Sequence, residues 1–170
     1  MCATALALCA SLPAQAEGMA LGLRYGEDGS DYNGSGISLR FHPWWLKEYG
    51  NWTASLSTAV EFTRFRYRGD GIGARSLSEI GGIGMFRFSR QAGWFRPYAE
   101  AGLGMSLFSR QDLGEKVFST AFQFSEHLGL GLGVGEHWAL GYRFSHYSNA
   151  DIQTPNKGLD VQQVMLSFSF

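Results

Sequence analysis

Apolar and polar residues alternate along most of this chain with a period of two, and this alternation limits the possible folds more than any other feature. The last segment is the clearest case, with Val164, Leu166, Phe168 and Phe170 alternating with Gln163, Met165, Ser167 and Ser169. Successive side chains of a β-strand point to opposite faces, so this period predicts strands that each have one apolar and one polar face.

Eight segments of the chain share this pattern. They are residues 19–25, 36–42, 51–63, 76–90, 94–107, 118–134, 136–149 and a last segment that follows an expected turn at Asn149–Gly158, whose outward series extends from Phe170 back to Asp160. The pattern is weakest in residues 76–90, where Ile83 and Met85 fall on the opposite parity to Ile80. Short and long connections alternate between the segments, including expected turns at Glu27–Asn33 and Trp45–Gly50. This layout predicts an all-β fold, an eight-stranded antiparallel transmembrane β-barrel with tight periplasmic turns and longer outer loops.

Composition helps to decide which face of the barrel meets lipid. Aromatic residues make up 15% of the chain, and charged residues only 17%, against about 25% in soluble domains. One parity holds nearly all the large apolar side chains, and the chain ends in Phe170. The other parity carries glycines, serines and the polar residues Arg24, Arg40, Glu61, Glu100, Gln123, His127 and Arg143. Small residues and paired charges fit the narrow lumen of eight strands, so we expect the apolar face to be lipid-facing. A soluble lipocalin-like barrel, with that face inside, is the alternative.

The first residues resemble an export signal. An apolar stretch from Ala3 to Leu12 precedes the small-x-small site Ala14-Gln15-Ala16, as in a secretory signal peptide. We therefore expect residues 1–16 to be a signal peptide, truncated at its start if the usual basic residues are missing, and residues 17–170 to form the outer-membrane barrel domain. The alternative is the buried N-terminal helix of a soluble protein. Both cysteines fall in this segment, and no Cys or His cluster has metal-ligand spacing, so we expect no metal and no cofactor. A net charge of -1 gives no general attraction to nucleic acid.

The informative residues are polar side chains on the lipid-facing parity near one end of the last two segments. His146 and Ser148 are two residues apart and therefore share a face. Asp160 shares the outward parity of the next, antiparallel segment, so the three side chains are expected close together at the extracellular rim. Ser, His and a carboxylate can form an acyl-transfer triad of nucleophile, general base and orienting acid. The alternative is the ordinary polarity of a barrel rim.

The run Phe144-Ser-His-Tyr-Ser-Asn-Ala150, followed by Pro155-Asn156-x-Gly158 and an acidic residue, resembles the C-terminal motif of the lipid A 3-O-deacylase (PagL) family. The resemblance implies an eight-stranded outer-membrane barrel that hydrolyses the ester-linked acyl chain at the 3-position of lipid A. It implies Ser148 as nucleophile and His146 as general base, with Asn149 and the backbone beyond it near the oxyanion. It also implies that Asn156 and Gly158 shape the loop and that Phe124 lines the acyl groove. One departure stands out, because the family's acid is Glu and this chain has Asp160.

We expect lipid A or lipopolysaccharide as the substrate. We also expect the chain to lie in the bacterial outer membrane and to cross it several times. A homodimer is compatible with the sequence. Two other functions remain as alternatives: a non-enzymatic small barrel, adhesive or structural, and an outer-membrane phospholipase or acyltransferase. Glu126 lies on the lipid-facing parity, either through a bulge that shifts the register or as a contact to substrate or a partner. Arg64, Arg66 and Arg68 are either loop charges or ligands of lipid A phosphates.

Overall fold

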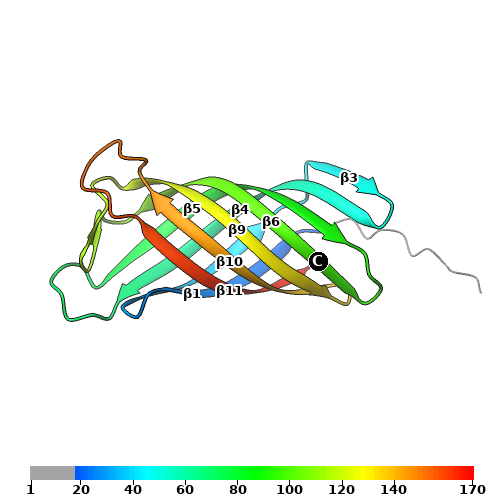
Figure 1. The fold of residues 1–170 in the computed structure, drawn as a ribbon, viewed down its shortest axis with the longest axis horizontal. Helices are drawn as coiled ribbons and strands as arrows, with labels where there is room; N and C mark the ends of the chain where they lie inside the picture. The colour runs from blue at the N-terminus through cyan, green and yellow to red at the C-terminus, as the bar shows by residue number, and fades with distance from the viewer. Residues whose placement is uncertain (1–17) are drawn as a thin grey trace, which may run out of the picture.

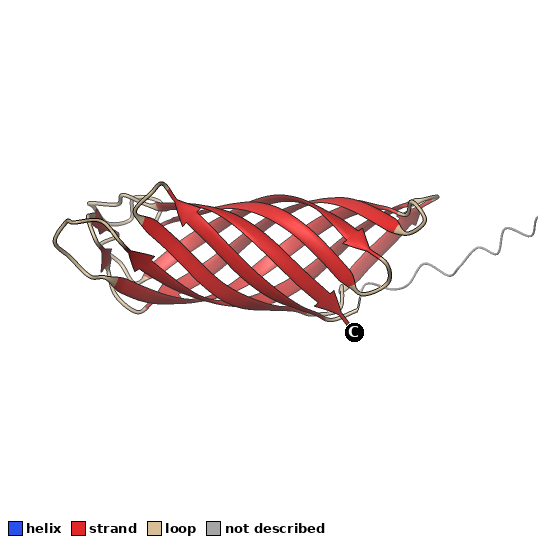
Figure 2. Cartoon of the chain, turned by 90° about the horizontal axis from the view of Figure 1, so that it is seen from below, coloured by secondary structure: helices blue, strands red, loops and turns tan. Residues whose placement is uncertain are grey.

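The computed structural model describes residues 18–170; the expected signal peptide lies outside the described residues. The strands are β1 (Ala20–Asp28), β2 (Tyr32–Arg40), β3 (Trp45–Tyr49), β4 (Trp52–Tyr67), β5 (Ser76–Arg90), β6 (Phe95–Phe108), β7 (Asp112–Leu113), β8 (Lys116–Val117), β9 (Phe122–Val134), β10 (Trp138–Ser148) and β11 (Leu159–Ser169). Antiparallel pairing runs in the order β2-β1-β11-β10-β9-β6-β5-β4 and closes through β2 and β4. The prediction of an eight-stranded antiparallel barrel is therefore confirmed (Figures 1 and 2). Between residues 18 and 170, no helix is long and apolar enough to cross a membrane.

The two ends of the barrel differ. One end, here called the loop end, carries the connections 68–75, 109–121 and 149–158, while the C-terminus and β3 lie at the other, terminal end (Figure 1). The expected alternation of loop lengths fails for the first two connections. The β1–β2 turn at the loop end is only residues 29–31, and Trp45–Gly50, expected as a turn, contains β3. β3 pairs with the start of β4 and extends the terminal end as a hairpin, and all its residues are exposed, so no alternation marks it.

The parity of the side chains matches the prediction along the wall. Outward residues such as Leu103 and Leu130 are 72% and 64% exposed, whereas the inward residues Glu61 and Glu100 are buried. The weak segment fits the same rule, because Ile83 and Met85 point inward and are buried while Ile80 is exposed. Two segments begin at different residues than expected: β9 starts at Phe122, not at residue 118, and β2 starts at Tyr32, before residue 36. The start of β11 at Leu159 agrees with the expected turn at Asn149–Gly158.

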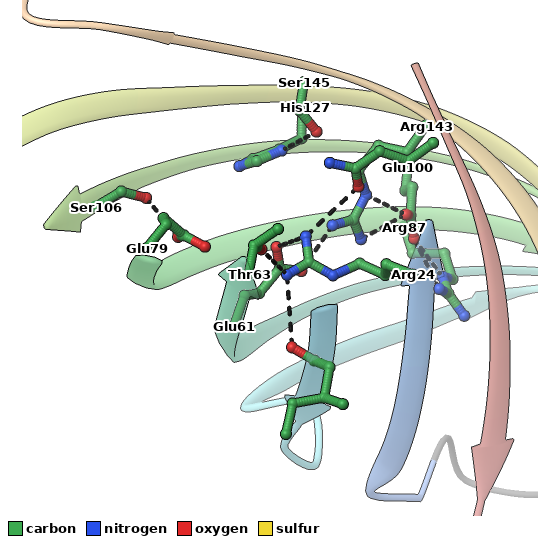
Figure 3. A network of polar contacts seen from close by, with 12 residues as sticks. Arg24, Glu61, Thr63, Glu79, Arg87, Glu100, Ser106, His127, Arg143 and Ser145 are labelled. Atoms are coloured by element: carbon green, nitrogen blue, oxygen red, sulfur yellow. Dashed lines mark hydrogen bonds and ion pairs between the residues drawn. The ribbon is translucent and has the colours of Figure 1, made fainter. Parts of the chain in front are cut away.

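A network of ion pairs crosses the middle of the lumen. Figure 3 shows Arg24, Arg87 and Arg143 gathered around Glu61 and Glu100. Arg143 spans the two carboxylates, with Nη1 lying 2.7 Å from Glu61 Oε1 and Nη2 lying 3.0 Å from Glu100 Oε1. Arg24 completes the partners of Glu61 and Arg87 those of Glu100. These residues come from β1, β4, β5, β6 and β10, so the network joins both sides of the barrel.

The lumen is not polar throughout, which corrects the expectation from the sequence. Near the loop end, inward-facing apolar side chains form a buried cluster: Phe65, Tyr67, Leu77, Phe108, Leu113, Phe118, Tyr147, Leu159 and Val161. Its aromatic rings pack mostly edge-on or tilted, as in the 5.8 Å contact between Phe65 and Tyr147. The cluster closes this end of the barrel. It also fixes β10 and β11 from inside, because Tyr147 and Leu159 are the inward neighbours of His146 and Asp160.

Candidate active site on the outer wall

The hairpin of β10 and β11 places His146 directly opposite Asp160. The two residues are cross-strand partners, and His146 Nδ1 lies 2.5 Å from Asp160 Oδ1. Their side chains are 36% and 55% exposed on the outward face. A contact this short between an imidazole and a carboxylate orients the ring and leaves Nε2 available for proton transfer.

Ser148 lies two residues beyond His146 on the same face of β10 and is half-buried. Its cross-strand partner on β9 is Phe124. Among the described residues, no hydrogen bond joins Ser148 Oγ to the His146 ring. Such bonds are often long or poorly aligned in an enzyme without substrate and tighten only when the substrate is bound.

Polar contacts from a neighbouring strand hold the start of β11 in place. Asp28 at the end of β1 accepts a hydrogen bond from the Asp160 backbone N–H at 3.0 Å. The same Asp28 oxygen lies 2.7 Å from Lys116 Nζ, and Lys116 also donates to the Gly158 carbonyl at 3.3 Å. The backbone around Asp160 is therefore hydrogen-bonded to the end of β1 through Asp28 and to β8 through Lys116.

The loop 149–158 is organised by two asparagines. Asn149 is fully buried, and its Nδ2 donates to the carbonyls of Phe118 and Gln153, both at 2.8 Å. Asn156 is half-buried; its Oδ1 accepts from the Asn149 backbone N–H at 3.5 Å, and its Nδ2 donates to Asp151 at 3.3 Å. The side-chain amide of Asn149 is thus already hydrogen-bonded to loop carbonyls. A donor for an oxyanion in this segment would therefore be a main-chain N–H or the Asn156 amide.

Backbone strain follows directly after Ser148 and Asn149. Ala150 and Asp151 have φ values of 53° and 57°, a region that costs non-glycine residues about 1–2 kcal/mol each. Strain of this kind tends to occur at functional sites. Gly158, at φ 61°, closes the loop, and a Cβ there would lie 3.3 Å from His146 Cε1 and 3.2 Å from the Tyr147 carbonyl. Only glycine therefore fits against the imidazole without displacing it.

A groove of about 570 Å³ runs over the outer wall from His146. It crosses β10, β9, β6, β5 and β4, and its lining includes Phe144, Leu128, Ala101 and Gly84. Gly84 contributes to the hollow, because a Cβ there would meet only the Leu103 carbonyl, at 3.8 Å. Apart from two histidines, Glu126 is the one polar residue in the lining. The resemblance implied an acyl groove, but the sequence did not indicate these lining residues, since they come from five different strands.

The structure places the other residues singled out in the sequence as follows. Phe124 lies beside Ser148 and packs edge-on against Phe122 at 5.0 Å, but it is not among the described residues that line the groove. Glu126 is exposed, and β9 pairs on both sides without a break in register, so the bulge alternative is wrong. Arg64 donates to Ser76 and Ser78 on β5. It stands on β4, four strands around the barrel from β10, so the structure does not bring it to His146.

The described residues also contain no group of three or more His, Cys, Asp or Glu side chains that could hold a metal ion. The site consists of a histidine, a serine and carboxylates on the outward wall, beside an apolar groove. This arrangement suits acyl transfer on a lipid, with the hydrocarbon chain held along the wall and the polar groups at the rim.

Comparison with known proteins gives the same class of protein. The family described as Lipid A 3-O-deacylase (PagL) matches residues 32–169. The chain belongs to the lipid A 3-O-deacylase family. A lipid A deacylase PagL from Bordetella bronchiseptica is 32% identical over 167 residues, which cover 95% of this chain and 89% of that protein. One from Pseudomonas aeruginosa is 28% identical over 117 residues, covering 69% of this chain and 65% of that protein.

The fold agrees with the family assignment. A crystal structure described as the outer membrane enzyme PagL is similar with a TM-score of 0.78 at 19% identity, covering 89% of this chain and 99% of that one. The predicted resemblance and the predicted class, a carboxylic ester hydrolase, are confirmed at the level of the lipid A 3-O-deacylase family. The barrel and the family together support an outer-membrane location for the chain.

Proposed function

We propose that this protein hydrolyses the ester-linked acyl chain at the 3-position of lipid A, with Ser148 as nucleophile, His146 as general base and Asp160 as the orienting acid. The observation that carries the proposal is the 2.5 Å contact between His146 Nδ1 and Asp160 Oδ1 on the outward wall, with Ser148 on the same face. The family supports the substrate, since both curated relatives are named lipid A deacylases.

The reaction needs only these groups and water. Ser148 Oγ attacks the ester carbonyl while His146 Nε2 removes its proton, and Asp160 stabilises the imidazolium that forms. The tetrahedral oxyanion takes hydrogen bonds from main-chain N–H groups after Asn149 and from the Asn156 amide. His146 then returns the proton to the sugar oxygen as the C–O bond breaks. Water, deprotonated by the same histidine, hydrolyses the acyl-serine and releases the fatty acid.

The register explains how Asp can act where the family has Glu. Asp is one methylene shorter, but Asp160 stands directly opposite His146 in the antiparallel pair. Cross-strand neighbours have Cβ atoms about 4.5–5.5 Å apart, so the short carboxylate reaches the ring directly. The contact to Nδ1 needs neither a backbone shift nor a bridging water.

The groove gives the acyl chain a place to lie. It starts at His146 and continues over an apolar surface of β9, β6 and β5. An acyl chain cleaved at Ser148 can stay in the outer leaflet, so the reaction never exposes the hydrocarbon chain to water. The Phe124 ring, next to Ser148, then lies near the first carbons of the chain.

Mass spectrometry of lipid A tests this function. Cells that express the unaltered protein should lose one ester-linked acyl chain from the 3-position, whereas cells with Ser148→Ala or His146→Ala should keep it. Each variant should still run as a heat-modifiable folded barrel in gel electrophoresis. Because the residues act as a unit, the double variant should be little worse than either single one.

The same assay separates the alternative functions. Intact lipid A with the unaltered, folded protein would favour a non-enzymatic barrel. Release of fatty acid from phospholipid, with lipid A unchanged, would favour a phospholipase. Full activity of Ser148→Ala would remove Ser148 as the nucleophile.

A further inference from the structure

Asp28 lies at the end of β1, where the pairing between β1 and β11 has already stopped. The last pair of that ladder is Glu27 with Gln162, two residues short of Asp160. The Asp28 side chain continues where the backbone pairing ends, because its Oδ2 accepts a hydrogen bond from the Asp160 N–H at 3.0 Å. A carboxylate thus takes the place of a missing ladder bond, directly at the orienting acid of the proposed triad.

The direction of this N–H shows how the backbone of Asp160 is held. The N–H and C=O of a strand residue point to the same side, so Asp160 and His146 form a non-hydrogen-bonded pair of the β10–β11 ladder. Side chains lie closer together in such pairs, which agrees with the 2.5 Å contact between His146 Nδ1 and Asp160 Oδ1. The same geometry turns the Asp160 N–H away from β10, so Asp28 holds this residue from the other side.

Lys116 connects the same carboxylate to the loop that follows β10. Its Nζ lies 2.7 Å from Asp28 Oδ2, and the two side chains are largely buried, with 18% and 19% exposure. Lys116 also donates to the Gly158 carbonyl at 3.3 Å. The ion pair therefore holds the backbone at both Gly158 and Asp160, while its two charges cancel beside the site.

The position of the Asp160 carboxylate matters because this group acts through the imidazole that it orients. A misplacement of about 1 Å at an active site can cost about 10²-fold in rate. We propose that Asp28 is a positioning residue for the proposed triad. Paired with Lys116, it fixes the backbone of Asp160 and so keeps the carboxylate against His146 Nδ1. This role rests on the proposed function and adds to it a residue from outside the β10–β11 hairpin.

A double-variant cycle tests whether Asp28 acts through Asp160. The readouts are kcat and KM for a long-chain 4-nitrophenyl ester, whose activated leaving group keeps slow variants measurable. Asp28→Ala should lower kcat about 10- to 100-fold and change KM less than about twofold, because the groove that binds the ester is unaltered. In an Asp160→Ala background the same substitution should change kcat less than about twofold, because the carboxylate that Asp28 positions is absent.

Conservative variants separate positioning from a general effect on the loop end. Asp28→Asn keeps an oxygen that can accept the Asp160 N–H, so it should recover most of the kcat lost in Asp28→Ala. Lys116→Met leaves the Asp28 carboxylate in place and should lower kcat only about 3- to 10-fold. The matched control is Glu27→Ala, which removes the neighbouring carboxylate of β1, bonded to Tyr25 at 2.8 Å. This control should keep the kcat of the unaltered protein.

Full kcat in Asp28→Ala would overturn the positioning role, and so would an equal loss in Glu27→Ala or in the Asp160→Ala background. If Asp28→Ala does not fold, judged by the heat-modifiable gel shift, the cycle is run with Asp28→Asn. Its neutral and weaker hydrogen bond should lower kcat about 2- to 5-fold, and only where Asp160 is present. An unchanged kcat, or an equal loss in both backgrounds, would then overturn the role. Full activity of Asp160→Ala would instead overturn the proposed triad itself.

Discussion

Replacement of Gly158 by alanine tests whether the loop fixes the imidazole of His146, the proposed general base. The added Cβ would lie 3.3 Å from His146 Cε1 and 3.2 Å from the Tyr147 carbonyl, inside ordinary van der Waals contact. Carbon atoms prefer about 3.5–4.0 Å, so the ring must move by about 0.2–0.7 Å. Misplacement by 1 Å can cost about 10²-fold in rate. We therefore expect kcat of Gly158→Ala to fall about 3- to 25-fold.

The matched control is Gly93→Ala in the β5–β6 turn at the terminal end. Gly93 has a φ of 66° and Gly158 one of 61°, so both substitutions carry a similar backbone cost, about 1–2 kcal/mol. A Cβ at Gly93 would meet no atom within 4 Å. Activity should be measured per folded protein, with the folded fraction taken from the heat-modifiable gel shift. Unchanged kcat in Gly158→Ala, or an equal loss in Gly93→Ala, would refute the role of this contact.

Two further predictions concern the acid and the lumen. Asp160→Asn should lower kcat by about 10⁴-fold, as the equivalent change does in a serine protease, while Asp160→Glu, the family's residue, should keep activity; near-normal turnover of the Asn variant would point to another acid. Arg143→Met leaves Glu61 and Glu100 short of one buried partner each, so the free energy of unfolding in liposomes, from urea titration, should fall by about 3–5 kcal/mol. An unchanged urea midpoint would show that the network is not needed for stability.

The wall of the barrel could be predicted from the sequence because side-chain parity is a local property. Most buried and exposed positions of the wall follow from the period of two once lipid is placed outside, as Ile83 and Met85 show in the weakest segment. The same parity placed His146 and Asp160 on one face of one hairpin. In a hairpin the pairing has few alternatives, since a slip by one residue would turn one of the two side chains to the lumen and separate them.

What could not be predicted depends on contacts between distant strands. The apolar cluster at the loop end uses inward residues such as Phe65 and Phe108, which interrupt an otherwise polar parity and reveal their packing only when the barrel closes. The sequence indicated that Arg143 and Glu61 lie inside, but not that they pair across the lumen. β3 was missed because its exposed residues show no alternation.

The identity of the nucleophile is the central claim, and active-site labelling tests it most directly. The folded barrel should be treated with a long-chain alkyl fluorophosphonate, digested, and analysed by peptide mass spectrometry. The account predicts one phosphonylated residue, Ser148, with labelling strongly slowed in His146→Ala and absent in Ser148→Ala. Label on another residue of the unaltered protein, or labelling of Ser148 at the same rate without His146, would contradict it.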